Sequence, residues 1–158
     1  MLDAVTDFKL LADPASLDVK LRELRAYWLS KKSEDGLPGR RDIDPLDIPR
    51  LMPYVALVDI LRDPLDYRYR LTGTKFVEMI GHNRTGMRAR EIFTGPLLEA
   101  TVALIGRLIE SRAPLAFEGR LFWIDKAYYR FQTLILPLAA DGKTVDMAIM
   151  GLDFRLDE

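Results

Sequence analysis

The chain has 158 residues and a formal net charge of −1, so its composition gives no support to nucleic-acid binding. Hydrophobic residues make up 49% of the sequence, enough for one core, but no apolar run reaches the roughly 18 residues of a membrane-spanning helix. The absence of cysteine excludes disulfides and thiolate sites within this chain, and with one histidine the sequence predicts no metal site.

The first predicted element is an amphipathic helix that follows a short mixed lead, residues 1–12. The lead carries aspartates where a signal peptide needs positive charge, so we expect a cytoplasmic protein. Asp13-Pro14 is typical of an N-cap followed by proline at the first helical position, and the helix is expected to end near Lys32. Its apolar residues recur at helical spacing and form one stripe: Leu17, Leu21, Leu24 and Trp28.

This stripe has to be covered. It can pack on its own domain or on a second copy of the chain, and the sequence leaves both arrangements open. For the second arrangement, the four stripe residues are the predicted interface of a homodimer.

A loop with the composition of a linker, Ser33 to Gly39, follows the helix. We therefore predict an N-terminal unit, residues 1–36, and a domain formed by residues 37–158. Asp44-Pro45 repeats the signal of a cap plus proline and predicts a single helical turn from Pro45 to Leu51, which Pro49 keeps short.

Two strands are predicted next, joined as a hairpin. The nearly continuous apolar run from Tyr54 to Leu61 indicates a central strand, in which Asp59 must find a partner or reach an edge. In the second strand, Tyr67 to Thr72, alternation places Tyr67, Tyr69 and Leu71 on one face.

Helices are predicted after this hairpin. Thr74 can cap a short helix from Lys75 to Ile80, and a turn of helix is expected from Arg90 to Phe93. A long helix is predicted to begin with Pro96 at its first position and to end at Ala113-Pro114. Because its apolar residues spread around most of its circumference, we expect it to be largely buried.

Three strands complete the pattern, at about residues 115–124, 128–138 and 145–156, joined by short turns. The order of elements predicts an α+β fold. Its five-stranded antiparallel sheet has short helices and one long helix inserted between the second and third strands, and an amphipathic helix precedes it.

This order, together with Arg-Tyr-Arg-Leu-Thr-Gly-Thr at 68–74 and Thr-Gly at 85–86, resembles the PAS sensory fold, in particular a bacterial family of small, largely stand-alone PAS-like proteins. Arg41-Asp42-Ile43-Asp44-Pro45, Ile48-Pro49 and Leu51-Met52-Pro53 add to the likeness, which covers about residues 20–154. The resemblance implies a cavity enclosed by the sheet and the short helices, and a first helix that serves dimerisation or signal transfer. It further implies a sensor that binds a small molecule or acts on a signalling protein partner.

The predicted ligand-binding residues would give such a cavity an aromatic and apolar wall with hydroxyl groups, and cations to meet an anionic ligand. They are Tyr69, Arg70, Phe76, Met79, Arg84, Phe117, Arg120 and Tyr129. The alternative is that the aromatic residues fill the core and the arginines are paired at the surface.

Some PAS relatives bind haem or flavin. The only histidine, His82, lies in a polar loop that favours a surface position over a haem ligand, and a thiol–flavin adduct needs a cysteine that the chain lacks. The cofactor, if there is one, stays unknown from the sequence.

The sequence supports a catalytic function less well than a sensory one. Four carboxylates could serve acid–base chemistry if they faced inward, namely Asp59, Glu78, Glu118 and Asp153. We predict a non-enzymatic sensor or interaction module. The alternatives are a small cavity enzyme on a similar α+β sheet and a ligand-free scaffolding or dimerisation domain.

Overall fold

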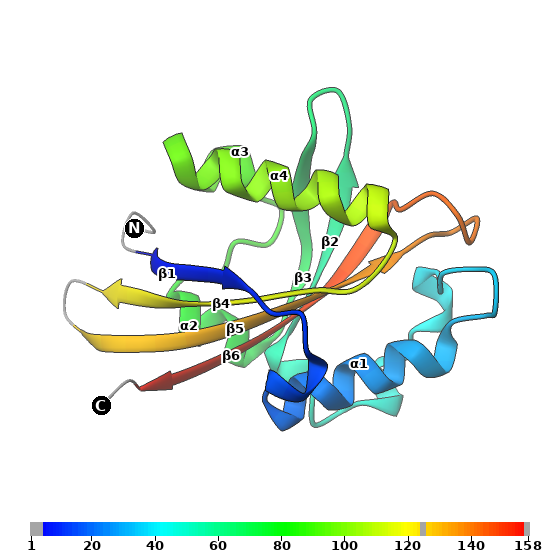
Figure 1. The fold of residues 1–158 in the computed structure, drawn as a ribbon, viewed down its shortest axis with the longest axis horizontal. Helices are drawn as coiled ribbons and strands as arrows, with labels where there is room; N and C mark the ends of the chain where they lie inside the picture. The colour runs from blue at the N-terminus through cyan, green and yellow to red at the C-terminus, as the bar shows by residue number, and fades with distance from the viewer. Residues whose placement is uncertain (1–4, 124–125, 157–158) are drawn as a thin grey trace.

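The computed structural model describes residues 5–123 and 126–156, and the side chains of residues 9–120 and 130–155. In this part of the chain, six strands form one antiparallel sheet in the order β1-β4-β5-β6-β2-β3 (Figure 1). The strands are β1 (Val5–Leu10), β2 (Val55–Leu61), β3 (Asp66–Thr72), β4 (Leu115–Trp123), β5 (Lys126–Leu138) and β6 (Met147–Leu156). The helices are α1 (Val19–Lys31), α2 (Thr74–Ile80), α3 (Ala89–Ile92) and α4 (Gly95–Ser111).

The predicted α+β plan is confirmed, but the prediction of five strands is wrong by one. The additional strand, β1, lies in the segment expected to be a mixed lead and pairs with β4 at the edge of the sheet. Its register shifts between Thr6 and Lys9. A short edge strand with a shifted register leaves too little alternation to be recognised in the sequence.

The N-terminal helix begins later than its proline suggested. Asp13 caps only one turn of 3₁₀ helix, Pro14–Ser16, after which Leu17 is extended. Asp18 is the N-cap of α1, and its side chain accepts a hydrogen bond of 2.9 Å from the Lys20 N–H. The second cap-plus-proline signal likewise gives one short turn, Pro45–Asp47.

The predicted apolar stripe, which begins at Leu17 just before α1 and continues along the helix, packs on the sheet of its own chain. Leu17, Leu21, Leu24 and Trp28 are all buried, with exposed fractions from 1% to 4%. The packing is close at Gly151 on β6, where an added Cβ would lie 2.8 Å from the side chains of both Leu21 and Leu24. The within-chain arrangement that the sequence left open is therefore the one adopted, and these side chains are inaccessible to a partner. The predicted division of the chain after residue 36 stays a prediction, although β1 and α1 both contact this sheet.

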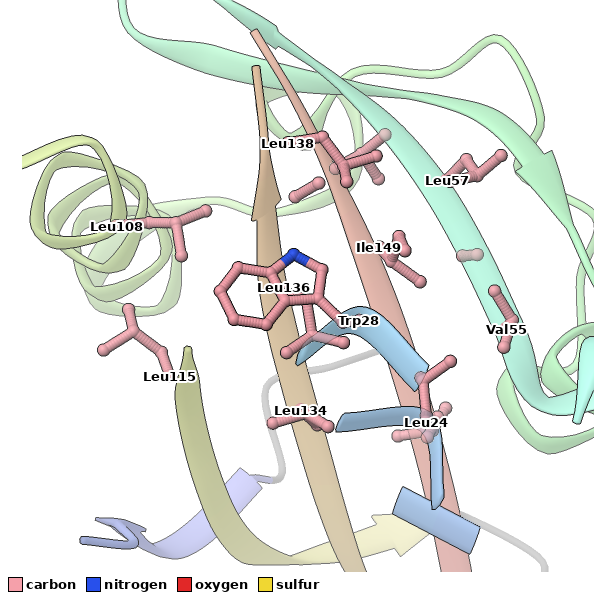
Figure 2. Close-up of a cluster of buried hydrophobic side chains, with 14 of the residues drawn as sticks. Leu24, Trp28, Val55, Leu57, Leu108, Leu115, Leu134, Leu136, Leu138 and Ile149 are labelled. Carbon is pink, nitrogen blue, oxygen red and sulfur yellow. The ribbon is translucent and has the colours of Figure 1, made fainter. Parts of the chain in front are cut away.

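Trp28 lies near the C-terminal end of α1 and anchors this end of the helix to the sheet (Figure 2). Its indole N–H donates a hydrogen bond of 2.8 Å to the buried carbonyl of Pro137. Pairing of β4 with β5 starts at Leu115 opposite Ile135, so Pro137 lies beyond the end of β4. A proline is tolerated there because no neighbouring strand requires its missing N–H.

Helix α4 covers the opposite face of the sheet from α1 (Figure 1). The expectation that it would be largely buried is wrong, since Ile105 and Leu108 are its only buried residues. Its other apolar residues are half-buried or exposed because α4 lies over a cavity instead of a filled core.

A β-bulge interrupts the alternation of β3. Val58 pairs with Tyr69 but the preceding Leu57 pairs with Leu71, so Arg70 is an extra residue in β3. The extra residue reverses which face the following side chain occupies. Leu71 was predicted to share a face with Tyr69; it is instead paired beyond the bulge and 38% exposed.

Candidate functional site

Between the sheet and α4 lies a cavity of about 660 Å³. Its floor is the pocket-facing side of strands β2 to β6, and its roof includes one side of α4. The lining residues of β5 and β6 follow the two-residue period of a strand: Phe131, Thr133 and Ile135 on β5, and Ala148, Met150, Leu152 and Phe154 on β6. One face of the sheet is thus built for α1 and the other for the cavity.

Aromatic rings form two parts of the cavity wall. Tyr69 meets the rings of Tyr67 and Phe76 edge to face, with centroid distances of 5.2 and 5.9 Å. Phe131 contacts Phe117 and Phe154 at 6.2 and 6.1 Å. Edge-to-face contacts such as those of Tyr69 hold large apolar rings in defined positions.

Two buried tyrosine hydroxyls belong to residues that line the cavity. The Tyr67 and Tyr69 hydroxyl oxygens are 3.2 Å apart, and either one can donate to the other. Burial raises the pKa of Tyr69 above its ordinary value and that of Tyr67 well above it. Both hydroxyls are therefore neutral hydrogen-bonding groups around pH 7.

Arg84 is the one charged residue among the described residues that line the cavity. It is half-buried, and its positive charge opposes the increase in pKa of both tyrosines. Within the described part of the chain, no carboxylate forms a salt bridge with it, whereas many of the other arginines there are paired in this way.

The loop that carries Arg84 is fixed to the edge of the sheet. Tyr69 donates its N–H to the Met87 carbonyl at 3.0 Å and accepts from the Gly86 N–H at 2.7 Å. Asn83 Oδ1 accepts hydrogen bonds from the Thr85 N–H and the Thr72 hydroxyl. Thr72 and Thr85 are joined by their hydroxyls at 3.0 Å. Strand β3 thereby sets the positions of both the tyrosines and the arginine.

Four of the eight predicted ligand-binding residues line the cavity: Tyr69, Phe76, Arg84 and Phe117. Three others do not. Arg70 is exposed at the bulge and bonded to Asp59 at 2.9 Å, Met79 packs against the core beside the cavity, and Arg120 is on the other side of β4 from Phe117. The side chain of Tyr129 lies outside the described ones.

The prediction missed most of the strand residues and all of α4. The missed wall includes Val58 and Ile60 on β2 and Leu97, Ala100, Thr101 and Leu104 on α4. The two-residue period of β5 and β6 could have identified the sheet residues once one of them was placed inside. No signal in the sequence showed that α4 faced a space.

The four carboxylates considered for catalysis are all ion-paired and none lines the cavity. Asp59 lies 2.9 Å from Arg70, and Glu78 lies 3.1 Å from Lys75. Glu118 pairs with Lys9, and Asp153 with Lys20 and Arg155. His82 is exposed in its loop and does not line the cavity, so it is not placed as a haem ligand. No metal-binding group of side chains is found among the described residues.

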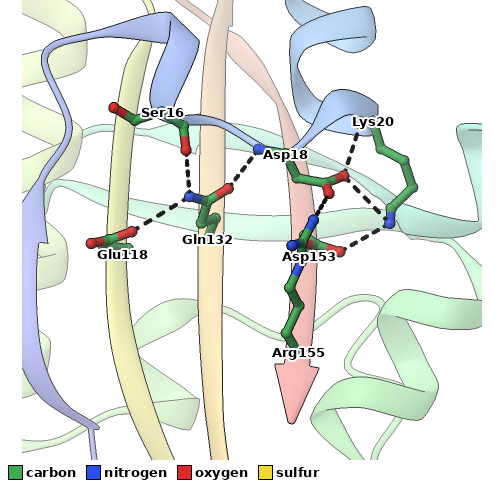
Figure 3. A network of polar contacts seen from close by, with 7 residues as sticks. All are labelled: Ser16, Asp18, Lys20, Glu118, Gln132, Asp153 and Arg155. Carbon is green, nitrogen blue, oxygen red and sulfur yellow. Dashed lines mark hydrogen bonds and ion pairs between the residues drawn. The ribbon is translucent and has the colours of Figure 1, made fainter. Parts of the chain in front are cut away.

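A network of polar contacts holds the start of α1 to the cavity-distal face of the sheet (Figure 3). The Gln132 amide accepts from the Asp18 N–H and donates to the Ser16 carbonyl, each at 2.8 Å. Asp18 also forms ion pairs with Lys20 and Arg155, both of which bind Asp153. Burial tends to raise the pKa of Asp18, but the hydrogen bonds from Lys20 and Arg155 together with their positive charges outweigh it, and the pKa is lowered.

Comparison with solved structures finds similarity to LOV domains. A LOV protein of Rhodobacter sphaeroides is 15% identical, covers 71% of this chain and 68% of its own length, and superposes with a TM-score of 0.49. A fungal LOV domain photoreceptor is 19% identical over 87% of this chain and 91% of its own, with a TM-score of 0.48. A thiol–flavin adduct cannot form within this chain, because it has no cysteine.

No curated protein matches the chain significantly. Among the helices that the structure describes, none is long and apolar enough to cross a membrane. The PAS domain model matches residues 18–152, which include α1, strands β2 to β5 and the first part of β6. The element order, the cavity and this match agree, and the chain belongs to the PAS domain family of sensory and signalling modules.

Proposed function

We propose that this PAS domain is a non-enzymatic sensor that binds a small molecule in the cavity beneath α4 and acts through contacts with another protein. The observation that supports it is the cavity itself. Its volume of about 660 Å³ falls within the range of roughly 300–1,000 Å³ that is usual for small-molecule sites. Apolar walls with a few polar groups are the usual composition of such sites.

Native mass spectrometry of the purified protein tests this function. We expect a retained small molecule in the wild type and its loss in Ala100→Trp, because Ala100 lines the cavity and an indole there occupies ligand space. Ala103→Trp is the matched control, since Ala103 is exposed on the same helix and does not line the cavity.

The results discriminate clearly. Retention by the wild type and Ala103→Trp but not by Ala100→Trp supports a ligand in this cavity. Equal retention by all three proteins places the molecule elsewhere. If none of them retains a molecule and a small-molecule library gives no shift in melting temperature, the sensor function by ligand binding is rejected.

The two alternatives have less support. A cavity enzyme needs a convergent acid–base group, and its best candidate, Asp59, is paired with Arg68 and Arg70 outside the cavity. A scaffolding domain needs a filled core and an exposed apolar face on α1, whereas the α1 stripe is buried.

Homodimer formation and a cytoplasmic signalling partner remain part of the proposal. A homodimer would use residues other than Leu17, Leu21, Leu24 and Trp28, because these are covered by their own sheet. Light scattering over a range of protein concentrations measures the oligomeric state directly.

A further inference from the structure

We propose that the ligand of this cavity is an amphipathic monocarboxylate, whose apolar body lies between α4 and the sheet and whose carboxylate binds Arg84 beside the Tyr67–Tyr69 hydroxyl pair. This inference rests on the proposed function and adds the chemical class of the ligand. Three features of the cavity support it: a cation without a carboxylate partner among the described residues, an excess of hydrogen-bond donors in the same wall, and an apolar remainder.

The cation is Arg84. A half-buried guanidinium without a carboxylate partner loses part of its hydration and gains no ion pair in return. It lines the same cavity as both tyrosines, and its loop is bonded to the Tyr69 backbone through Gly86 and Met87, so the cation and the hydroxyls belong to one part of the wall. A carboxylate placed there would accept two parallel hydrogen bonds from the guanidinium, the geometry that arginine is best suited to provide.

The tyrosine pair also has a proton to donate. Two hydroxyls carry two protons, and the 3.2 Å contact between them uses one. Within the described part of the chain, no other acceptor bonds either hydroxyl, so the second proton is available to a ligand. A carboxylate accepts only, and an arginine and a tyrosine that both donate are complementary to it.

The rest of the cavity selects an apolar body. Apart from Arg84 and the two tyrosines, the described lining residues are aliphatic or aromatic, with three threonines among them. The Thr101 hydroxyl is already used, because it donates to the Leu97 carbonyl at 2.8 Å. A second charge on the ligand would be left without a partner in this apolar space, which is costly. The cavity therefore favours one terminal anionic group.

Decanoate and 1-decanol test this inference, because they share a ten-carbon body and differ in charge. Titration calorimetry at pH 7 with the wild type should give decanoate an affinity roughly 10- to 100-fold higher than decanol, the usual effect of a hydrogen bond to a charged group. Arg84→Met should remove this preference by weakening decanoate and leaving decanol unchanged. Arg107→Met is the control, since Arg107 is exposed on α4 and does not line the cavity.

Each result decides the inference. A preference for decanoate in the wild type and Arg107→Met that is lost in Arg84→Met supports it. Equal binding of both probes, stronger binding of decanol, or no binding of decanoate overturns it. If Arg84→Met does not fold, the comparison of the two probes on the wild type still decides.

The charge of the retained molecule in native mass spectrometry gives an independent check. A neutral or cationic molecule, retained by the wild type and lost in Ala100→Trp, overturns the monocarboxylate inference and leaves the sensor function standing. A retained monocarboxylate supports both.

Discussion

At the scale of single residues, Gly73 shows how closely two segments meet next to the cavity. It lies between β3 and α2, and an added Cβ would lie 2.2 Å from the Met52 carbonyl oxygen and 2.4 Å from that of Pro53. Its N–H donates to the Val55 carbonyl at 2.7 Å, so the backbone cannot move away without losing this bond. The sequence suggested only that Gly73 ends a strand, whereas the packing requires the absence of a side chain.

Alanine at Gly73 should destabilise the domain by at least about 3 kcal/mol, because the clash is with backbone that cannot rotate away. Gly106→Ala is the matched control, since the nearest atom to its added Cβ is Leu65 Cδ2 at an ordinary 3.7 Å. Within α4 that change should stabilise by about 0.5–1 kcal/mol. Urea unfolding measures both, and a similar effect of the two changes would contradict the close approach at Gly73.

Arg70 and Leu71 show what a residue pattern cannot give. Alternation correctly placed Tyr67 and Tyr69 together, and both line the cavity. The bulge at Arg70 then reversed the pattern for Leu71. A bulge depends on how two strands pair, and neither strand's own sequence specifies that register.

At the scale of elements, the N-terminus of α1 depends on the charge of Asp18. Its carboxylate caps the helix and contacts Lys20 and Arg155, and its pKa lies below the ordinary value of 3.8. A carboxylate with a lowered pKa in the folded state contributes stability above its unfolded pKa. That contribution is lost as the pH falls through the folded pKa.

Asp18→Asn keeps an acceptor for the cap but removes the ion pairs, so at pH 7 it should cost about 1–2 kcal/mol of unfolding free energy. The difference from the wild type should shrink below pH 3.8, where the wild-type carboxylate also loses its charge. Asp35→Asn, a change of the same charge at an exposed position of the linker, is the control. Urea unfolding across pH 3 to 7 measures this, and a difference that does not vary with pH would contradict it.

The type of most helices and strands could be predicted from the sequence, but the residues at which they begin and end were harder to predict. The long apolar runs of β2 and β6 and the stripe of α1 were evident, because each carries a strong period. Asp13-Pro14 misplaced the start of α1, since two capping aspartates lie five residues apart and only packing on the sheet selects Asp18. Edge strand β1 had no comparable signal.

At the scale of the whole molecule, the two faces of the sheet have different tasks. One face binds α1 in a closely packed layer, and the other is covered by α4 at a distance that leaves a cavity. The residues of both faces are apolar, so the hydrophobic pattern is the same for each. Whether a face is packed or hollow depends on the position of the covering helix. For this reason the cavity was expected only from resemblance, and three of its eight predicted residues, Arg70, Met79 and Arg120, lie off its wall.

Substitutions of two leucines of α1 distinguish a role of this helix in folding from a role in dimerisation. Leu24 is 1% exposed and Leu29 is 43% exposed on the same helix. Leu24→Asp should cost more than about 3 kcal/mol and abolish cooperative unfolding, because it buries an unpaired charge. Leu29→Asp should change stability by no more than about 0.5 kcal/mol. Thermal unfolding with light scattering measures both, and a folded monomeric Leu24→Asp would show that Leu24 serves a dimer instead.

The loop from Asn83 to Arg88 has one more consequence, for solubility. Strand β3 is an outer strand, and such strands expose backbone groups that can recruit a strand from another molecule. Here the Tyr69 N–H and carbonyl are both occupied by the loop. The same few residues thus hold a cation at the cavity and cover part of the edge of β3. Substitutions that release this loop should therefore increase aggregation in concentrated solution and also disturb the ligand site.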